Sequence, residues 1–181
     1  MREIVEKAGD TMERGVIHIS PGEGRTLRVW DEMVTYKTTS DQTGGAYSLF
    51  EVVSRPGTGP PLHVQHREDE AFWVLRGEYE FLIESRTTRT STGSLIYIPR
   101  GNLHAHKNVG GEPGRMLVTH TPGGLHERFF ERVGEPTTNS PSLPVSEERL
   151  DAKALVRIAA QYGIEMTPPA SAGEIDGKEM R

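Results

Sequence analysis

The chain has 181 residues, a formal net charge of −5 and no cysteine. This length suits one domain with room for a core and polar ends. The negative charge argues against nucleic acid as a partner, because nucleic-acid binding needs a basic surface. Without cysteine there is no disulfide, thiolate-bound zinc or iron–sulfur cluster. Any metal must therefore be bound by histidine, carboxylate or amide groups.

The hydropathy of the chain predicts no membrane segment. Hydrophobic residues make up 34% of the chain and the mean hydropathy is −0.54. No apolar run approaches the roughly 20 residues that span a bilayer. The first ten residues, MREIVEKAGD, are charged and lack an apolar signal core. We therefore expect a cytoplasmic protein with no membrane partner.

The first three quarters of the chain have the pattern of a β-protein. Residues 1–15 are polar and of mixed charge, which indicates a loosely attached arm. Val16–Ser20 looks like a first strand. From there to residue 134, short runs rich in Val, Thr and aromatic residues alternate with Gly/Pro turns. Many short strands between such turns predict an all-β sandwich or barrel over 16–134.

The hydrophobic period changes after the barrel. Leu125, Phe129 and Val133 follow a helical spacing, and Gly134 would end that short helix. The next residues, 135–145, are rich in Pro, Ser and Thr and indicate a linker.

A second helix is predicted over 146–163. Ser146 is a suitable N-cap, and Gly163 suits the position after the last turn. Its apolar stripe should pack on the barrel or on a second subunit. Residues 164–181 are interpreted as a disordered tail.

Histidine and carboxylate side chains of two stretches can meet inside such a barrel. Side chains alternate along a strand, so His63 and Gln65 point one way and His66 the other. Two facing strands can aim His63, Glu70 and His104 at one point. Two histidines and one carboxylate form the facial triad that suits non-haem iron(II). Its imidazoles must be neutral, so metal affinity should fall in mild acid.

The residue pattern alone leaves other interpretations of these histidines and carboxylates open. The chain has 7 histidines, and an isolated histidine is more often structural or exposed than a ligand. The run REDE at residues 67–70 is more often a solvated acidic face.

The two stretches resemble the two motifs of the cupin family. The first motif, Gly-x5-His-x-His-x3–4-Glu-x6-Gly, is matched by Gly57, His63, Glu70 and Gly77, with Gln65 in place of the second histidine. The second, Gly-x5-Pro-x-Gly-x2-His-x3-Asn, is matched throughout, by Gly93, Pro99, Gly101, His104 and Asn108. The likeness runs from about Gly22 to Gly134 and is similar to the single-domain, quercetin-2,3-dioxygenase-like branch.

This resemblance implies a cupin jelly-roll β-barrel, or double-stranded β-helix, to which the hydrophobic pattern adds a short helix after the barrel and a C-terminal helix. It also implies a divalent metal inside, with His63, position 65, Glu70 and His104 as ligands. Iron is the expected metal, and manganese, nickel, cobalt, zinc and copper are the other candidates. Because such proteins are often dimeric, we expect a homodimer, with Trp73 on an exposed face.

Glutamine at position 65 departs from the family pattern and leaves three interpretations. Gln65 binds the metal weakly or through water, because an amide oxygen is a weaker ligand than imidazole for late transition metals. Alternatively, His106 replaces the missing histidine, since it shares a strand face with His104. In the third interpretation the metal is lost and the pocket only binds a small molecule. His106 is also the best candidate for a polar group lining the pocket, because its inward direction follows from that of His104.

The resemblance implies an oxygenase that acts on a small aromatic or enol-type substrate bound to the metal. Glu70 would be the catalytic residue, as the base that deprotonates the substrate. The cupin fold also hosts other activities. The alternatives are a non-catalytic small-molecule-binding cupin, as a sensor or storage module, and a tailoring isomerase or cyclase.

Overall fold

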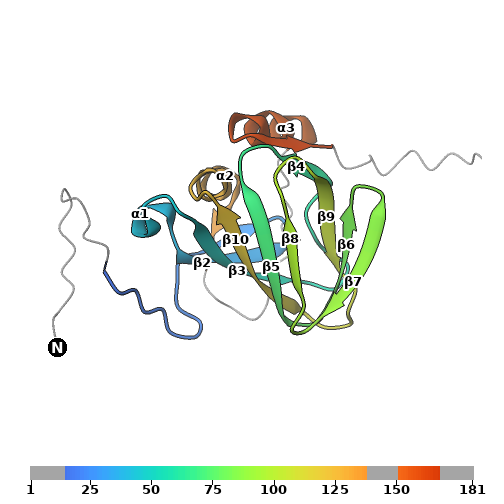
Figure 1. The fold of residues 1–181 in the computed structure, drawn as a ribbon, viewed down its shortest axis with the longest axis horizontal. Helices are drawn as coiled ribbons and strands as arrows, with labels where there is room; N and C mark the ends of the chain where they lie inside the picture. The colour runs from blue at the N-terminus through green and yellow to red at the C-terminus, as the bar shows by residue number, and fades with distance from the viewer. Residues whose placement is uncertain (1–14, 138–150, 168–181) are drawn as a thin grey trace, which may run out of the picture.

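The computed structural model describes residues 15–137 and 151–167, whose strands form two antiparallel sheets that face each other (Figure 1). The larger sheet has the order β11 (Glu135–Pro136), β1 (Thr26–Val29), β2 (Glu32–Thr38), β3 (Ser48–Ser54), β10 (Gly114–Thr121), β5 (Asp69–Arg76) and β8 (Leu95–Ile98). The smaller sheet has the order β12 (Ile164–Met166), β4 (His63–Gln65), β9 (Leu103–Asn108), β6 (Glu78–Ile83) and β7 (Arg86–Ser91). The predicted all-β jelly-roll fold is confirmed.

Alternation along the strands builds the core between the sheets. In β3 every second residue is buried, and β9 follows the same pattern from His104 to Asn108. Inward positions of both sheets supply large apolar side chains, among them Phe50, Phe72 and Phe81. The same alternation turns polar side chains such as His104 into the barrel, so the fold itself sets the direction of the site residues.

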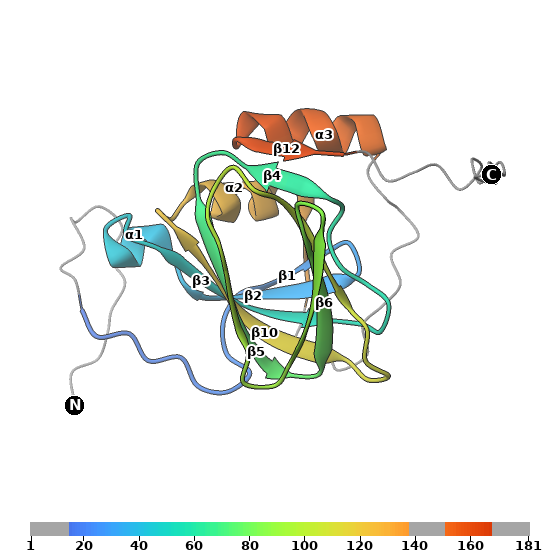
Figure 2. The same ribbon diagram turned by 45° about the vertical axis from the view of Figure 1, so that its right-hand side comes forward.

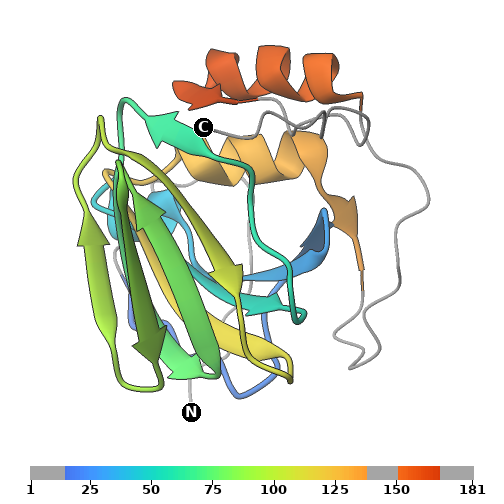
Figure 3. The same ribbon diagram turned by 90° about the vertical axis from the view of Figure 1, so that its right-hand side faces the viewer.

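Two helices lie over one end of the barrel (Figures 2 and 3). The first, α2 (Leu125–Val133), follows β10 and buries Phe129 and Phe130, which confirms the short helix predicted after the barrel. The second, α3 (Ala152–Gln161), lies outside α2 and packs Leu155 and Ala159 into the core. A four-residue helix, α1 (Ser40–Thr43), connects β2 and β3.

The predicted C-terminal helix is present but shorter at its start than expected. Asp151 caps α3 by accepting a hydrogen bond from the Ala154 amide, whereas the predicted cap, Ser146, lies outside the described residues. Gly163 has φ of +77°, as suits the position after a helix end.

Three predictions about the ends of the barrel were wrong. Ile164–Met166 is a strand, not part of a disordered tail, because Ile164 and Met166 are buried and the segment pairs with β4. Glu135–Pro136 pairs with β1 where a linker was predicted. Val16–Ser20 forms no strand, since Val16 is 96% exposed and the segment has no strand partner in the described chain. The remaining parts of the predicted arm, linker and tail, residues 1–14, 138–145 and 168–181, lie outside the described residues.

The helices of the described segments are short. None has the length and apolar character that a membrane-spanning helix requires.

Candidate metal centre

His63 and His104 stand opposite each other on neighbouring strands. The antiparallel pairing of β4 with β9 places the two residues in register. Their rings lie 4.3 Å apart between centroids and are tilted by 54°. Each ring places Nδ1 2.9 Å from a backbone carbonyl two residues earlier, that of Pro61 for His63 and that of Asn102 for His104. Because Nδ1–H donates to that carbonyl, Nε2 of both rings is left to act as a ligand.

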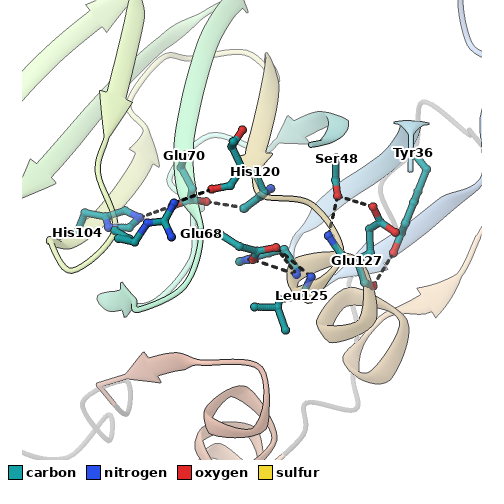
Figure 4. A network of polar contacts seen from close by, with 12 residues as sticks. Tyr36, Ser48, Glu68, Glu70, His104, His120, Leu125 and Glu127 are labelled. Atoms are coloured by element: carbon teal, nitrogen blue, oxygen red, sulfur yellow. Dashed lines mark hydrogen bonds and ion pairs between the residues drawn. The ribbon is translucent and has the colours of Figure 1, made fainter. Parts of the chain in front are cut away.

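Glu70 reaches the two histidines from the opposite sheet. It lies on an inward position of β5, and its Oε2 is 2.6 Å from His104 Nε2 (Figure 4). One ligand atom from each of His63, Glu70 and His104 lies within 4.8 Å of the others, and all three residues are buried. The structure thus brings together the three residues that the sequence aims at one point.

Two of the three side chains, His63 and Glu70, have a shifted pKa that favours the protonation state that binds a metal. Burial and the neighbouring His104 lower the pKa of His63 to about 3, so this imidazole is neutral. Burial alone would raise the pKa of Glu70, but His120 and His104 hold that pKa well below its usual range. Burial opposes a charge on His104 too, yet the hydrogen bond to Glu70 raises its pKa above 6.5.

A second histidine pair, which the sequence did not connect with the site, lies on the other side of Glu70. Nε2 of His120 is 2.7 Å from Glu70 Oε1, an ion-pair contact without the direction of a hydrogen bond. His120 and His126 stack with centroids 3.9 Å apart and planes 19° apart. Their nitrogens also come within 4.8 Å of Glu70. However, the lone pairs of two stacked rings run nearly parallel, so as they stand they do not converge on one ion.

This pair could have been found only in part from the sequence. His120 lies on β10, and its alternation with the buried Val118 indicates an inward side chain. His126 belongs to the first turn of α2, and no local pattern shows that this turn meets β10.

Gln65 and His106 occupy different surroundings. Gln65 is 2% exposed, and neither polar atom of its side-chain amide has a hydrogen-bond partner among the described residues. His106 is buried on the same face of β9 as His104, but its Nε2 lies 3.4 Å from Oε1 of Glu32, a residue that the sequence analysis missed. His106 is therefore not a member of the group formed by His63, Glu70 and His104. His66 points outward and pairs with Glu165, as alternation predicts.

A small cavity of about 40 Å³ is lined both by His63 and Glu70 and by the pair of His106 and Glu32. Its polar wall includes His63, Glu70, His106, His120 and Glu32. Its other lining residues are mostly apolar, among them Trp30, Val34, Phe72, Val118, Phe129 and Phe130. Such a volume is far below the roughly 300–1,000 Å³ of sites for drug-sized ligands.

The residues present fit a divalent transition metal. His63 and His104 offer correctly oriented Nε2 atoms, and Glu70 offers a carboxylate of lowered pKa. Within the part of the chain that the structure describes, the side-chain amide of Gln65 is buried without a partner, which is uncommon for a polar group that serves structure alone. His63, Glu70 and His104 would hold the ion, which would polarise a bound oxygen atom as a Lewis acid.

Comparisons with known proteins agree with this barrel. Residues 50–120 match the family model described as a cupin domain. The chain is 30% identical over 78 residues to the inner kinetochore subunit cnp3 of Schizosaccharomyces pombe, covering 42% of this chain and 12% of that protein. It is 26% identical over 99 residues to mannose-1-phosphate guanylyltransferase 2 of Escherichia coli O157:H7, covering 55% of this chain and 20% of that protein. The chain thus spans only a small part of the length of these relatives.

A solved structure shows the same fold along most of its length. A Thermotoga maritima protein described as a predicted oxalate decarboxylase superposes with a TM-score of 0.55 and 17% identity, over 59% of this chain and 99% of that chain. At this identity the likeness concerns the fold alone. Together with the match of residues 50–120 to the cupin domain model, it shows that the barrel has the cupin fold.

Proposed function

We propose that this protein is a metal-dependent cupin of the oxygenase type, related in function to quercetin 2,3-dioxygenases and acting on a small enol-type or aromatic substrate. Iron(II) is the first candidate metal, because two histidines and one carboxylate leave open positions for substrate and oxygen. The observation that carries the proposal is the convergence of His63, Glu70 and His104 within 4.8 Å, with both imidazoles oriented through Nδ1.

The chain's own residues account for binding and proton handling. His63 and His104 hold their rings in one orientation because each Nδ1–H is tied to a carbonyl. Glu70 lines the cavity and its low pKa keeps it ionised. Because a low pKa also makes a weak base, Glu70 would accept the proton only of a substrate hydroxyl that a bound metal acidifies. His120, 2.7 Å from Oε1, is the next group on that path. The apolar wall around them excludes bulk water.

A non-catalytic small-molecule-binding cupin is the second candidate. It is favoured by Gln65, which replaces a family ligand, and by the cavity of about 40 Å³, which is too small for a flavonol without rearrangement. In that function the same polar wall would bind a small molecule without chemistry.

Metal analysis separates the two candidates. Protein purified without chelators and supplemented with iron, manganese, nickel, cobalt or zinc should hold about one metal ion per chain under the first proposal. His63→Ala and His104→Ala should abolish metal binding. His66→Ala should leave it unchanged, because His66 follows β4 and points out of the barrel toward Glu165. A metal content far below one per chain in every supplement would contradict the oxygenase.

Turnover is then tested on the metal-loaded protein. Oxygen consumption with a panel of flavonols and smaller enols is the expected result. Conversion of a panel member without oxygen consumption would favour a tailoring isomerase or cyclase instead.

A further inference from the structure

We propose that Glu32 and His106 form a second polar subsite in the cavity, which binds a hydrogen-bond donor of the substrate, such as a hydroxyl group. We further propose that this cavity discriminates against substrates with a second anionic group. Both statements rest on the proposed function, because they assume that the substrate's other end lies at His63, Glu70 and His104.

Glu32 is a charged side chain placed inside the barrel. It begins β2, is 6% exposed and lines the cavity. Ser54, its register partner on β3, donates a hydrogen bond to Oε1 through its hydroxyl. His106 approaches the same oxygen from the other sheet, with Nε2 at 3.4 Å, and also lines the cavity. A buried carboxylate is costly to desolvate unless it has polar partners, and Ser54 and His106 supply them here. Because Glu32 also lines the cavity, its carboxylate can accept a further hydrogen bond from a ligand.

The subsite lies at a fixed distance from the metal-ligand group. His104 and His106 are two residues apart on one face of β9, which separates them by about 7 Å along the strand. The ring of Phe72 lies beside both, 6.5 Å from His104 and 5.4 Å from His106 between centroids. A ligand that spans the two groups therefore has polar atoms at both ends and an apolar middle.

The charges of the cavity determine which polar group is accepted. Among the described residues that line it, two are carboxylates, Glu32 and Glu70, and none is lysine or arginine. A carboxylate or phosphate on the far end of a ligand would face Glu32 without a cation to pair with it. A hydroxyl group can instead donate to Glu32 and accept from or donate to His106. The subsite thus favours hydroxylated over dicarboxylate or phosphorylated ligands.

Three chelators that share one ring test this directly. Pyromeconic acid has the metal-chelating hydroxyketone alone, kojic acid adds a hydroxymethyl group at the far side of the ring, and comenic acid places a carboxylate there. Each is titrated into Co(II)-loaded protein by visible absorption, and each affinity is divided by the affinity for free Co(II). Kojic acid should bind about ten- to a hundred-fold more tightly than pyromeconic acid, because a hydrogen bond to a buried charged group contributes a free energy of this size. Comenic acid should bind more weakly than pyromeconic acid.

Glu32→Gln and His106→Gln identify the residues responsible. Each should remove most of the preference for kojic acid, and Glu32→Gln should also relax the discrimination against comenic acid. Glu80→Gln is the control, since it makes the same charge change at a surface pair with Arg89. Circular dichroism and thermal melting show whether each variant is folded, and two variants keep the test informative if one is not.

The outcomes separate this inference from the proposed function. Absence of Co(II) binding would remove both. Three results obtained with protein that does bind Co(II) would overturn the subsite alone: equal affinities for pyromeconic and kojic acid, no binding of any of the three chelators, or an unchanged preference for kojic acid in folded Glu32→Gln. Glu32 would then be a residue that only joins the two sheets.

Discussion

His104 Nε2 lies 2.6 Å from Glu70 Oε2, so each side chain points its metal-binding atom at the other. Both residues are buried, which makes this contact stronger than a surface pair. Burial opposes the charged form of His104, but Glu70 raises its pKa above 6.5. Below that pKa, a metal ion that binds here must therefore displace a proton from His104.

The first prediction is that metal affinity rises with pH. Below the raised pKa of His104 the metal competes with one proton, so the affinity should increase about tenfold per pH unit and level off once that pKa is passed. His63, whose pKa is lowered to about 3, should add no further step near neutrality. Calorimetry of Co(II) binding in buffers of different ionisation enthalpy measures the proton release, expected to approach one per ion.

His104→Ala cannot serve as the control, because it removes a ligand. His66→Ala does, since His66 is exposed and pairs with Glu165 outside the barrel. An affinity independent of pH around neutrality, with no proton released, would show that His104 is already neutral in the metal-free protein.

The second prediction concerns His120 as a positioning residue for Glu70. Its Nε2 contacts Oε1 at 2.7 Å, which leaves Oε2 to face His63 and His104. His120→Phe keeps a ring that can stack on His126 but removes the contact with the carboxylate. Metal affinity should fall by about 10–100-fold, the usual effect of losing a group that orients a ligand.

Competition with a fluorescent chelator measures that loss, and electron paramagnetic resonance of the Co(II) form reports a change in the coordination of Glu70. A merely structural role would lower thermal stability without moving the spectrum of the bound ion. His120→Gln, which retains a polar atom near Oε1, should recover part of the affinity.

The third prediction is that Glu68 anchors helix α2 over the barrel. Its carboxylate accepts hydrogen bonds from the backbone amides of Leu125 and His126, in the first turn of α2 (Figure 4). Because Glu68 is 2% exposed, Glu68→Ala leaves these amides without partners and should lower the free energy of unfolding by about 1–3 kcal/mol. Glu68→Gln retains an acceptor and should cost less. Urea denaturation gives both values, and equal stabilities of wild type and Glu68→Ala would contradict the anchor.

The fold was predictable because its signals are local. Turn residues at short intervals and two spaced motifs predict the jelly roll, which is confirmed. Alternation on strands also places His63, Glu70 and His104 correctly, since each belongs to a motif of fixed spacing. Their role as metal ligands stays a prediction.

The rest of the site depends on contacts that no local pattern reveals. Glu70 meets His120 across 50 positions of the chain, and His106 meets Glu32 across 74. The first contact follows from the register of β10 on β5, and the second from the packing of one sheet on the other. Alternation alone determines neither. The three-residue strand Ile164–Met166 was missed for a similar reason, because so short a segment becomes a strand only through pairing with β4.

The fourth prediction is the homodimer. β8 lies at the edge of the larger sheet and, among the described strands, pairs with β5 alone. Its neighbourhood exposes Trp73, Leu95 and Tyr97 to 53%, 59% and 58%. An apolar sheet edge of this kind invites pairing with another chain, and a second copy offers the same edge in antiparallel orientation.

Sedimentation velocity tests this association. The wild-type chain should sediment as a dimer, and Leu95→Lys with Tyr97→Lys should shift it to monomer. Glu80→Lys, on the other sheet, is the control for added positive charge. A wild-type monomer at the highest soluble concentration would refute the dimer.

The last prediction returns to Gln65, whose amide is buried without a hydrogen-bond partner. Its backbone carbonyl accepts a hydrogen bond of 2.7 Å from Gly101 of the second motif, so β4 is held against the loop that leads to His104. Alternation gives its side chain the same inward direction as His63. Gln65→His should therefore add an imidazole ligand and raise metal affinity by at least about tenfold, since even groups that only orient ligands change affinity by that much.

The three interpretations of position 65 give different results in one titration series. If Gln65 is a weak ligand, wild type binds metal, Gln65→Ala binds it more weakly and Gln65→His more tightly. If His106 is the replacement, Gln65→His changes nothing and His106→Ala abolishes binding, an outcome that the contact of His106 with Glu32 argues against. If the metal has been lost, wild type binds none and Gln65→His restores binding. Because His63, Glu70 and His104 already converge in the presence of glutamine, we expect the first pattern.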